Sequence, residues 1–349
     1  MALNRAATRN DWIMNVLVLG GTDFLGRHIV EVALARGDSV TIFNRGRTNP
    51  ALFGDSVERR TGDRAADLSA LHVGTWDAAI DTSGYFPVDV RASAKLLADR
   101  VAHYTFVSTL SVYANPIAQT HEDAPLHSPI VGDNMTVTGE TYGPLKVACE
   151  NAVTAAMPGR NVIARAGFLV GPHDNVPRLR YWLRRIARGG RILAPGGPER
   201  LAQLIDARDM ATFLLACAER RSAGIYNVTG DPGTVTLSET LHTSRDVIGA
   251  DAEFVWASDD TLTAENVPLF DGLPYWVPEA WQSFMRTPTD RAKEAGFAAR
   301  PIDQTIRDTW AQLGQDPGDM PPHRTELNGL EIVCGISAQR EAAILDGMG

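Results

Sequence analysis

The chain has 349 residues, enough for two domains or for one large domain with an appended lobe. It is 44% hydrophobic and 21% charged, the composition of a globular protein with a sizeable core, which excludes extensive disorder. A net charge of -9 disfavours a general nucleic-acid or anionic-membrane binder, so we expect a small-molecule partner.

The cysteines and the apolar stretches disfavour three further classes: disulfide-rich, metal-binding and membrane proteins. Cys149, Cys217 and Cys334 lie far apart and show no ligand spacing to the histidines, so we expect neither a disulfide framework nor a metal site. No apolar stretch reaches the ~18 residues that a membrane helix needs. Residues 1–13 are polar and predict a flexible tail. These features favour a cytoplasmic protein without a membrane partner.

Short apolar runs alternate with amphipathic stretches in the first half of the chain. This alternation predicts a parallel sheet covered by helices on both faces, a doubly wound α/β fold. The expected strands are Asn15–Leu19, Ser39–Phe43, Val57–Arg60, Ala78–Asp81, Tyr104–Ser108 and Asn161–Arg165. The expected helices are Phe24–Arg36, Val88–Asp99 and Tyr142–Ala156, with Gly37 placed to end the first.

The second half is less regular and predicts a smaller, discontinuous substrate lobe. Leu204–Ala218 has a helical pattern and Gly224–Val228 a strand pattern, so we expect the chain to return to the sheet there. A short helix is expected to begin near Ser337. The predicted units are a dinucleotide-binding domain (14–170 plus 201–230), a substrate lobe (171–200 plus 231–325) and a C-terminal extension (326–349).

A glycine-rich loop directly follows the first expected strand and opens the first expected helix. A dinucleotide needs glycine there for a tight turn and for close approach of the backbone to its pyrophosphate. The predicted phosphate loop consists of Gly20, Gly21, Thr22, Asp23, Phe24, Leu25 and Gly26.

Two features of the expected adenosine ribose site conflict. The second strand ends at Asn44, which is not acidic, and Arg45 and Arg47 follow as candidate partners for the 2'-phosphate of NADP(H). Asp23 carries negative charge near the same site, which disfavours a 2'-phosphate if its carboxylate points that way. We expect NADP(H) to be favoured over NAD(H), because two arginines outweigh one carboxylate.

Tyr142 and Lys146 form a Tyr-x-x-x-Lys pair on one face of an expected helix. A lysine ammonium beside a tyrosine favours the phenolate and so lowers the phenol pKa toward a useful range for proton transfer. A run of hydroxyl residues that includes Ser108, Thr109 and Ser111 ends the strand some thirty residues earlier. Such a hydroxyl suits the role of holding a reacting oxygen.

These motifs resemble those of extended short-chain dehydrogenases/reductases of the NAD-dependent epimerase/dehydratase type, over residues 14–315. The nearest likeness is to the chloroplast stem-loop RNA-binding proteins and their actinobacterial reductase relatives. The resemblance implies that Thr109 orients the reacting oxygen, with Ser108 as the alternative, and that Asp63 binds the adenine amino group. It also implies cofactor contacts by Arg64, Ser83, Gly84, Lys146 and Ala166. Helix-mediated dimers are common in that family, so a homodimer is an open alternative.

Departures from the family pattern restrict the chemistry. Leu110 and Ser111 stand where nucleotide-sugar dehydratases place an acid and a base, which disfavours dehydration. Ala202 stands where sugar-nucleotide epimerases carry a diphosphate-binding arginine, with Arg200 nearby. Candidate substrate contacts are Tyr85, Phe86, Ser111 and Trp276, the last from an aromatic cluster that also contains Phe270, Tyr275, Trp281 and Phe284.

Three functions remain open from the sequence. The first is an NADP(H)-dependent oxidoreductase that acts on a carbonyl or secondary alcohol of a small or sugar-like molecule. The second is a sugar or nucleotide-sugar epimerase with tightly bound NAD. The third is a nucleic-acid-binding protein that keeps a dinucleotide. The six arginines between Arg178 and Arg191 give this function weak support.

Overall fold

The computed structural model describes residues 13–115, 117–118, 120–130, 132, 135–319, 322–327 and 329–348. The expected flexible tail lies outside the described residues except for Ile13. Within the described residues, no helix combines the length and the apolar character that crossing a bilayer would require.

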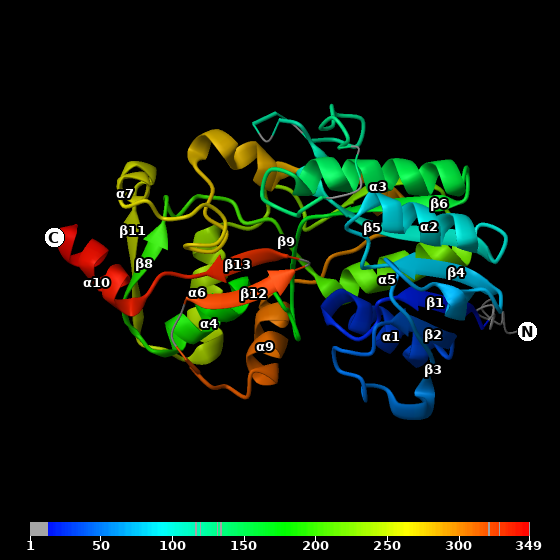
Figure 1. Ribbon diagram of the computed structural model, residues 1–349. Coiled ribbons are helices and arrows are strands. Elements are labelled where there is room, and N and C mark those ends of the chain that lie inside the picture. The colour runs from blue at the N-terminus through cyan, green and yellow to red at the C-terminus, as the bar shows by residue number, and fades with distance from the viewer. Residues whose placement is uncertain are drawn as a thin grey trace, which may run out of the picture.

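A seven-stranded parallel sheet forms the larger domain, so the expected doubly wound fold is confirmed (Figure 1). The strand order is β10-β6-β5-β4-β1-β2-β3. The strands are β1 (Asn15–Leu19), β2 (Ser39–Asn44), β3 (Glu58–Thr61), β4 (Trp76–Asp81), β5 (Val101–Thr109), β6 (Asn161–Ala166) and β10 (Gly224–Val228). The chain therefore returns to the sheet at Gly224–Val228, as expected.

Two pairs of helices cover the sheet. α1 (Phe24–Arg36) packs beside α5 (Ala207–Arg220), and α2 (Pro87–Leu97) packs beside α3 (Tyr142–Ala156), on the opposite face (Figure 1). α1 ends as expected, because Gly37 adopts the left-handed conformation (φ 87°) and its N–H bonds back to the last turn. Apolar side chains from both faces of the sheet form the two cores of this domain.

The helix expected over Leu204–Ala218 begins three residues later than expected. Leu204–Asp206 is instead a short buried strand, β9, which pairs in parallel with β7 (Phe168–Val170). Asp206 then caps α5, because its side chain accepts the backbone N–H of Arg208. A run of buried apolar residues fits strand and helix equally well, so the local pattern could not separate them.

The smaller lobe is built around the parallel pair β8 (Gly190–Pro195) and β11 (Ala252–Ala257). Its helices are α4 (Arg178–Ala187), α6 (Leu237–Ile248), α7 (Asp259–Ala264) and α9 (Ile302–Gln312), and α8 (Asp290–Glu294) packs on β10 of the larger domain. Short 3-10 helices are η1 (Gly54–Ser56), η2 (Ser69–Leu71), η3 (Leu110–Val112) and η4 (Glu279–Arg286). Tyr181 and Trp182 are fully buried in the core of the lobe.

The last part of the chain is an integral part of the smaller lobe rather than a separate extension. The antiparallel hairpin β12 (His323–Leu327) and β13 (Leu330–Cys334) crosses between the lobe and the sheet domain (Figure 1), and the expected boundary at residue 326 falls inside it. α10 (Ala338–Gly347) follows, and its Ile344 and Leu345 enter the core of the lobe. Ser337 caps this helix, close to the expected start.

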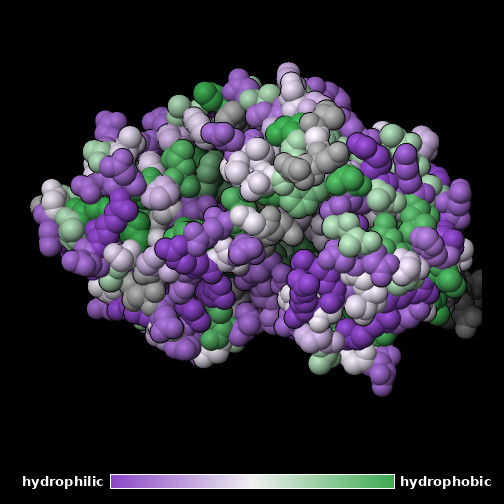
Figure 2. All heavy atoms as spheres, viewed as in Figure 1, coloured by the Kyte–Doolittle hydropathy of each residue, from purple (hydrophilic) through white to green (hydrophobic). Residues whose placement is uncertain are grey.

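The face of the molecule shown in Figure 2 is mostly hydrophilic, and its hydrophobic side chains lie in separate small groups. The large hydrophobic side chains that are exposed among the described residues are far apart along the chain: Ile13, Val73, Val88 and Ile117. Doubly wound folds bind ligands at the carboxyl ends of the sheet strands, which here lie where the two lobes meet.

Candidate active site

The glycine-rich loop adopts a backbone conformation that only glycine tolerates well. Gly20 and Gly21 have φ values of 114° and 92°, and a Cβ atom on Gly26 would lie 2.7 Å from the backbone nitrogen of Gly21. The loop therefore turns tightly onto the first turn of α1, whose free N–H groups suit an anionic phosphate. The residues present fit a dinucleotide at this position.

Asp23 caps α1 and also reaches the second lobe. Its Oδ1 accepts the N–H of Phe24 over 3.1 Å, and its Oδ2 accepts a hydrogen bond of 2.8 Å from Nδ2 of Asn175. The carboxylate is thus engaged by the helix end and by an amide of the opposite lobe. The sequence alone left its direction open.

The expected ribose site lies beside the same loop. Asn44 donates from Nδ2 to the carbonyl of Gly20 and accepts the N–H of Gly46, both over 2.9 Å, so its amide fixes the turn. Arg45 and Arg47 are exposed at the cavity described below, and neither forms an ion pair within the described part of the chain.

Asp63 and Arg64 line the adjoining wall. Asp63 accepts the N–H of Ala65 over 3.1 Å. Arg64 makes two hydrogen bonds of 2.8 Å to the buried carboxylate of Asp81 and a third of 2.6 Å to Ser93. Because of its charge, Arg64 holds the pKa of Asp81 below its usual range, although burial opposes this. Most of the hydrogen-bonding capacity of Arg64 is used inside the protein.

Thr109 and Tyr142 come together where β5 ends and α3 begins. Oγ1 of Thr109 accepts the N–H of Ser111 over 3.2 Å and donates to the Ser111 hydroxyl over 3.2 Å. Burial raises the pKa of Tyr142, while a hydrogen bond with Thr109 and the positive charge of Arg178 oppose that rise. The phenol of Tyr142 therefore remains protonated around neutral pH.

Lys146 lies one helical turn after Tyr142 and is only 4% exposed. Its Nζ donates to the carbonyls of Gly84 (2.8 Å) and Val107 (2.7 Å), and it lies 5.6 Å from the ring centre of Tyr85. Burial lowers the pKa of Lys146. An ammonium has three donors, so the two carbonyl bonds fix its position and leave one donor for a ligand.

Ser108, the alternative to Thr109, borders the cavity described below, but its hydroxyl is bound in a buried network. Its hydroxyl donates to Oε1 of Glu150 over 2.6 Å, and Glu150 forms an ion pair of 2.8 Å with Arg165. The burial of Arg165, which is 1% exposed, places this network behind the active site.

One cavity of about 1010 Å³ joins these groups, close to the upper end of typical ligand sites. Of the predicted site residues and their alternatives, it is lined by Gly20, Gly21, Thr22, Asp23, Phe24, Leu25, Gly26, Asn44, Arg45, Arg47, Asp63, Arg64, Ser83, Tyr85, Phe86, Ser108, Thr109, Ser111, Tyr142, Lys146 and Ala166. Gly84 reaches it only through Lys146, which its carbonyl holds.

Trp276 does not line this cavity, contrary to the expectation for a substrate contact. It is 2% exposed, its Nε1 donates to Asp259 over 2.9 Å, and it packs in the core of the smaller lobe. Its neighbours Phe270, Trp281 and Phe284 do line the cavity. Since no regular periodicity governs this segment, the sequence could not separate the core positions from the cavity positions.

Sequence reasoning missed several lining residues. Phe168 lies two residues beyond the end of β6, at the same edge of the sheet, so its position was a usable signal. Leu330, Glu331 and Ile332 reach the cavity from the hairpin β12–β13. Nothing local to the hairpin predicts that contact, because it depends on how the lobe docks on the sheet.

The arginine run does not form a single cationic face. Arg178 pairs with Asp271 and Arg185 with the buried Glu341, both over 2.7 Å. Arg188 donates to the carbonyl of Gly318. Across the described ranges, no group of three or more His, Cys, Asp or Glu side chains is placed to hold a metal ion.

A doubly wound sheet with a glycine-rich loop at its switch point is typical of a dinucleotide-binding protein, and a tyrosine–lysine pair beside a threonine lines the same cavity. Residues 16–229 match the model of the NAD dependent epimerase/dehydratase family. The chain belongs to this family.

Comparison with known proteins finds a distant relative and several similar folds. The chain is 24% identical over 235 residues to the chloroplast stem-loop binding protein of 41 kDa b of Arabidopsis thaliana. The aligned region covers 62% of this chain and 58% of that protein. The fold resembles that of Bordetella bronchiseptica WbmH in complex with NAD+, with a TM-score of 0.65, 16% identity and coverage of 87% and 99% of the two chains. It also resembles Thermotoga maritima UDP-glucose 4-epimerase, with a TM-score of 0.62, 16% identity and coverage of 86% and 99%.

Proposed function

We propose that this protein is an NADP(H)-dependent oxidoreductase that interconverts a carbonyl group and a secondary alcohol. The observation that carries the proposal is the convergence of Thr109, Tyr142 and Lys146 on the cavity that the glycine-rich loop also lines. When bound, the nicotinamide accepts or supplies a hydride.

Each of the three side chains has its own role in the proposed reaction. The Thr109 hydroxyl orients the substrate oxygen, and the Tyr142 phenol exchanges a proton with it. Because burial raises the pKa of Tyr142, the phenol is a proton donor at neutral pH, which suits carbonyl reduction. Lys146, held by two backbone carbonyls, keeps its remaining donor for the cofactor ribose.

The choice of NADP(H) rests on charge at the far end of the cavity. Arg45 and Arg47 are exposed there without an ion-pair partner among the described residues, and Asn44 contributes no negative charge. The carboxylate of Asp23 already accepts hydrogen bonds from Phe24 and Asn175. Guanidinium groups bind phosphate in a bidentate manner, so these arginines fit a 2'-phosphate.

An epimerase with tightly bound NAD is the second candidate, favoured by the resemblance in fold to the UDP-glucose 4-epimerase described above. The same three residues would serve oxidation and re-reduction. Against it, Ala202 is buried and Arg200 pairs with Asp259 over 2.6 Å, so neither residue lines the cavity to hold a sugar diphosphate.

The decisive first experiment is titration calorimetry of the purified protein with NADPH and NADH, together with the absorption spectrum of the supernatant after denaturation. Exchangeable binding that favours NADPH supports the proposal. NAD retained through purification supports the epimerase instead. Binding of neither dinucleotide contradicts both.

The Tyr142→Phe substitution tests the chemistry. It removes the proton donor while retaining the ring, so we expect kcat to fall by about 10²- to 10⁴-fold with an unchanged Kd for NADPH. Tyr226→Phe is the matched control, since Tyr226 lies outside the cavity. Equal activity of the two variants would exclude Tyr142 as the proton donor.

A further inference from the structure

Four aromatic side chains form one wall of the cavity. We define the aromatic wall as Phe168, Phe270, Trp281 and Phe284. The ring centroids lie 6.0 Å apart for Phe168–Phe270, Phe168–Phe284 and Phe270–Phe284, and 6.2 Å apart for Phe270–Trp281. All four are half-buried, so they retain apolar surface that faces the cavity.

The aromatic wall lies next to the catalytic residues. Phe284 packs against the apolar cluster of Leu110, Val112 and Tyr113, which directly follows Thr109. Arg178, whose charge acts on the pKa of Tyr142, has its guanidinium 5.2 Å above the ring of Phe168. A molecule held by Thr109 and Tyr142 therefore contacts this wall.

The backbone that presents Phe270 is held in an unusual conformation. Phe270 and Tyr275 both have positive φ values, 62° and 72°, which cost free energy for residues with bulky side chains. Two backbone hydrogen bonds fix this turn: Phe270 N–H to the carbonyl of Trp276 (3.0 Å) and Tyr275 N–H to the carbonyl of Phe270 (3.1 Å). Strain of this kind, maintained by surrounding structure, is typical of ligand sites.

The charges beside the aromatic wall cancel. Arg178 pairs with Asp271 over 2.7 Å, and Glu331 pairs with Arg324 over 2.6 Å. Lys146 already donates to two carbonyls. Arg45 and Arg47, which form no ion pair among the described residues, lie at the opposite, ribose end, and the remaining donor of Lys146 is assigned to the cofactor ribose, so an anionic substrate would lack a partner near the wall.

We propose that the substrate is a neutral carbonyl compound, or the corresponding secondary alcohol, whose flat apolar ring packs on the aromatic wall. Stacked and edge-to-face contacts between rings favour such a ligand. In the reduction, the carbonyl carbon receives the hydride that the reduced dinucleotide supplies and the oxygen receives the proton of Tyr142, so the ketone becomes an alcohol and the dinucleotide is oxidised. This inference rests on the proposed oxidoreductase function.

Three probes test the proposal: acetophenone, which is neutral and aromatic; benzoylformate, which has the same ring and a carboxylate; and UDP-glucose. Calorimetry in the presence of saturating NADP+ measures binding, and NADPH oxidation measures turnover. We expect acetophenone to bind most tightly and to have the highest kcat/KM. Preference for benzoylformate or UDP-glucose in both assays, or binding of none of the three, overturns the proposal.

Substitutions in the wall give the second test. Phe270→Ala and Phe284→Ala should each weaken acetophenone binding by about tenfold and leave the Kd of NADPH unchanged. Phe270→Tyr should restore binding. Phe254→Ala, at a half-buried aromatic position outside the cavity, is the control and should behave as the unmodified protein. Equal effects of the wall and control variants contradict the proposal.

Binding and turnover separate the two proposals. Acetophenone that binds through the wall without being reduced supports the wall as its site and contradicts the oxidoreductase function. Reduction of benzoylformate with no measurable binding of acetophenone supports the oxidoreductase function and overturns the neutral-ring substrate.

Discussion

The hydroxyl of Ser108 donates to Glu150 over 2.6 Å, while the next residue, Thr109, faces the cavity. Successive side chains of a strand point to opposite sides, so the hydroxyl of Ser108 enters the buried network and that of Thr109 does not. Glu150 thereby connects the end of β5 to Arg165 on β6 and to its own helix, α3.

Removal of Glu150 should be strongly destabilising. Glu150→Ala leaves the buried Arg165 without its carboxylate partner, and we expect a loss of about 3–5 kcal/mol in the free energy of unfolding. Urea denaturation measures this loss. Asp246→Ala breaks the exposed Arg245–Asp246 pair and should cost at most about 1 kcal/mol. If both variants lose a similarly small free energy of unfolding, the buried Glu150–Arg165 pair contributes little to stability.

The arginines at the ribose end should determine the choice of cofactor. Arg45→Ala and Arg47→Ala should each weaken NADPH binding by about 1.5–3 kcal/mol, the typical value of a hydrogen bond to a charged group, and leave NADH binding nearly unchanged. Calorimetry with both dinucleotides measures the ratio. Arg307→Ala, on the exposed face of α9, is the control. Parallel losses for NADPH and NADH would assign these arginines a role other than 2'-phosphate recognition.

Gly26→Ala should abolish dinucleotide binding. A Cβ atom at this position would come within 2.7 Å of the Gly21 backbone, which has no flexible side chain that could yield. Gly197→Ala is the matched control, because a Cβ there meets no atom within 4 Å and the backbone φ is not positive. The test is calorimetry with NADPH, with circular dichroism to verify folding. Normal binding by a folded Gly26→Ala variant would show that the loop does not contact the cofactor.

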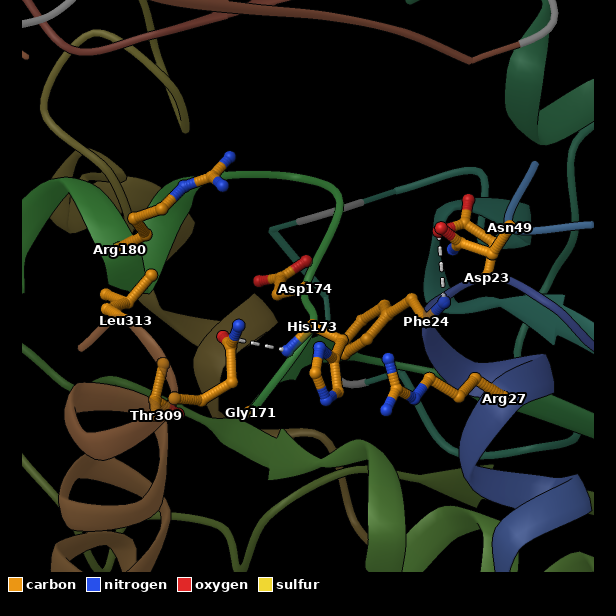
Figure 3. Close-up of a pocket in the computed structure, with 11 residues that line it drawn as sticks. Asp23, Phe24, Arg27, Asn49, Gly171, His173, Asp174, Arg180, Thr309 and Leu313 are labelled. Atoms are coloured by element: carbon orange, nitrogen blue, oxygen red, sulfur yellow. Dashed lines mark hydrogen bonds between the residues drawn. The ribbon is translucent and has the colours of Figure 1, made fainter. Parts of the chain in front are cut away.

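Asp174 should make stability depend on pH. It lies between Arg180 on one side and Asp23 and Asn49 on the other (Figure 3), in a small pocket of about 230 Å³. Burial raises the pKa of its carboxyl to about 7, from 3.8 when exposed, and its Oδ2 has no hydrogen-bond partner among the residues that the structure describes. The native state therefore binds more protons than the unfolded chain between these values, and the stabilisation is lost as pH rises from about 4 to about 7.

Asp174→Asn should remove this dependence, because the amide stays neutral and can still accept the N–H of Val176. We expect a higher Tm than that of the unmodified protein at pH 8, with the difference disappearing towards pH 4. Asp99→Asn, at an exposed position after α2, is the control. A Tm difference that is the same at both pH values would exclude titration of Asp174 as the cause.

Much of the fold and site follows from local sequence. The bounds of β1, α1 and α3 agree with the expected ones, because continuous apolar runs, a capping aspartate and a terminal glycine act within a few residues. The Tyr142–Lys146 pair was also predictable, since residues four apart share a helix face. The directions of the Ser108 and Thr109 side chains were not predictable, because Ser108 binds Glu150, which lies 42 positions further along the chain.

The sequence by itself determined the doubly wound domain, the glycine-rich loop and the tyrosine–lysine motif, since these depend on periodicity and turn chemistry over short spans. Only the tertiary structure decided that Asn175 holds Asp23, that Trp276 is a core residue and that the hairpin β12–β13 reaches the cavity. Each of these contacts joins segments far apart in sequence. Their geometry is set by how the smaller lobe packs against the sheet, and short-range patterns carry no information about that packing.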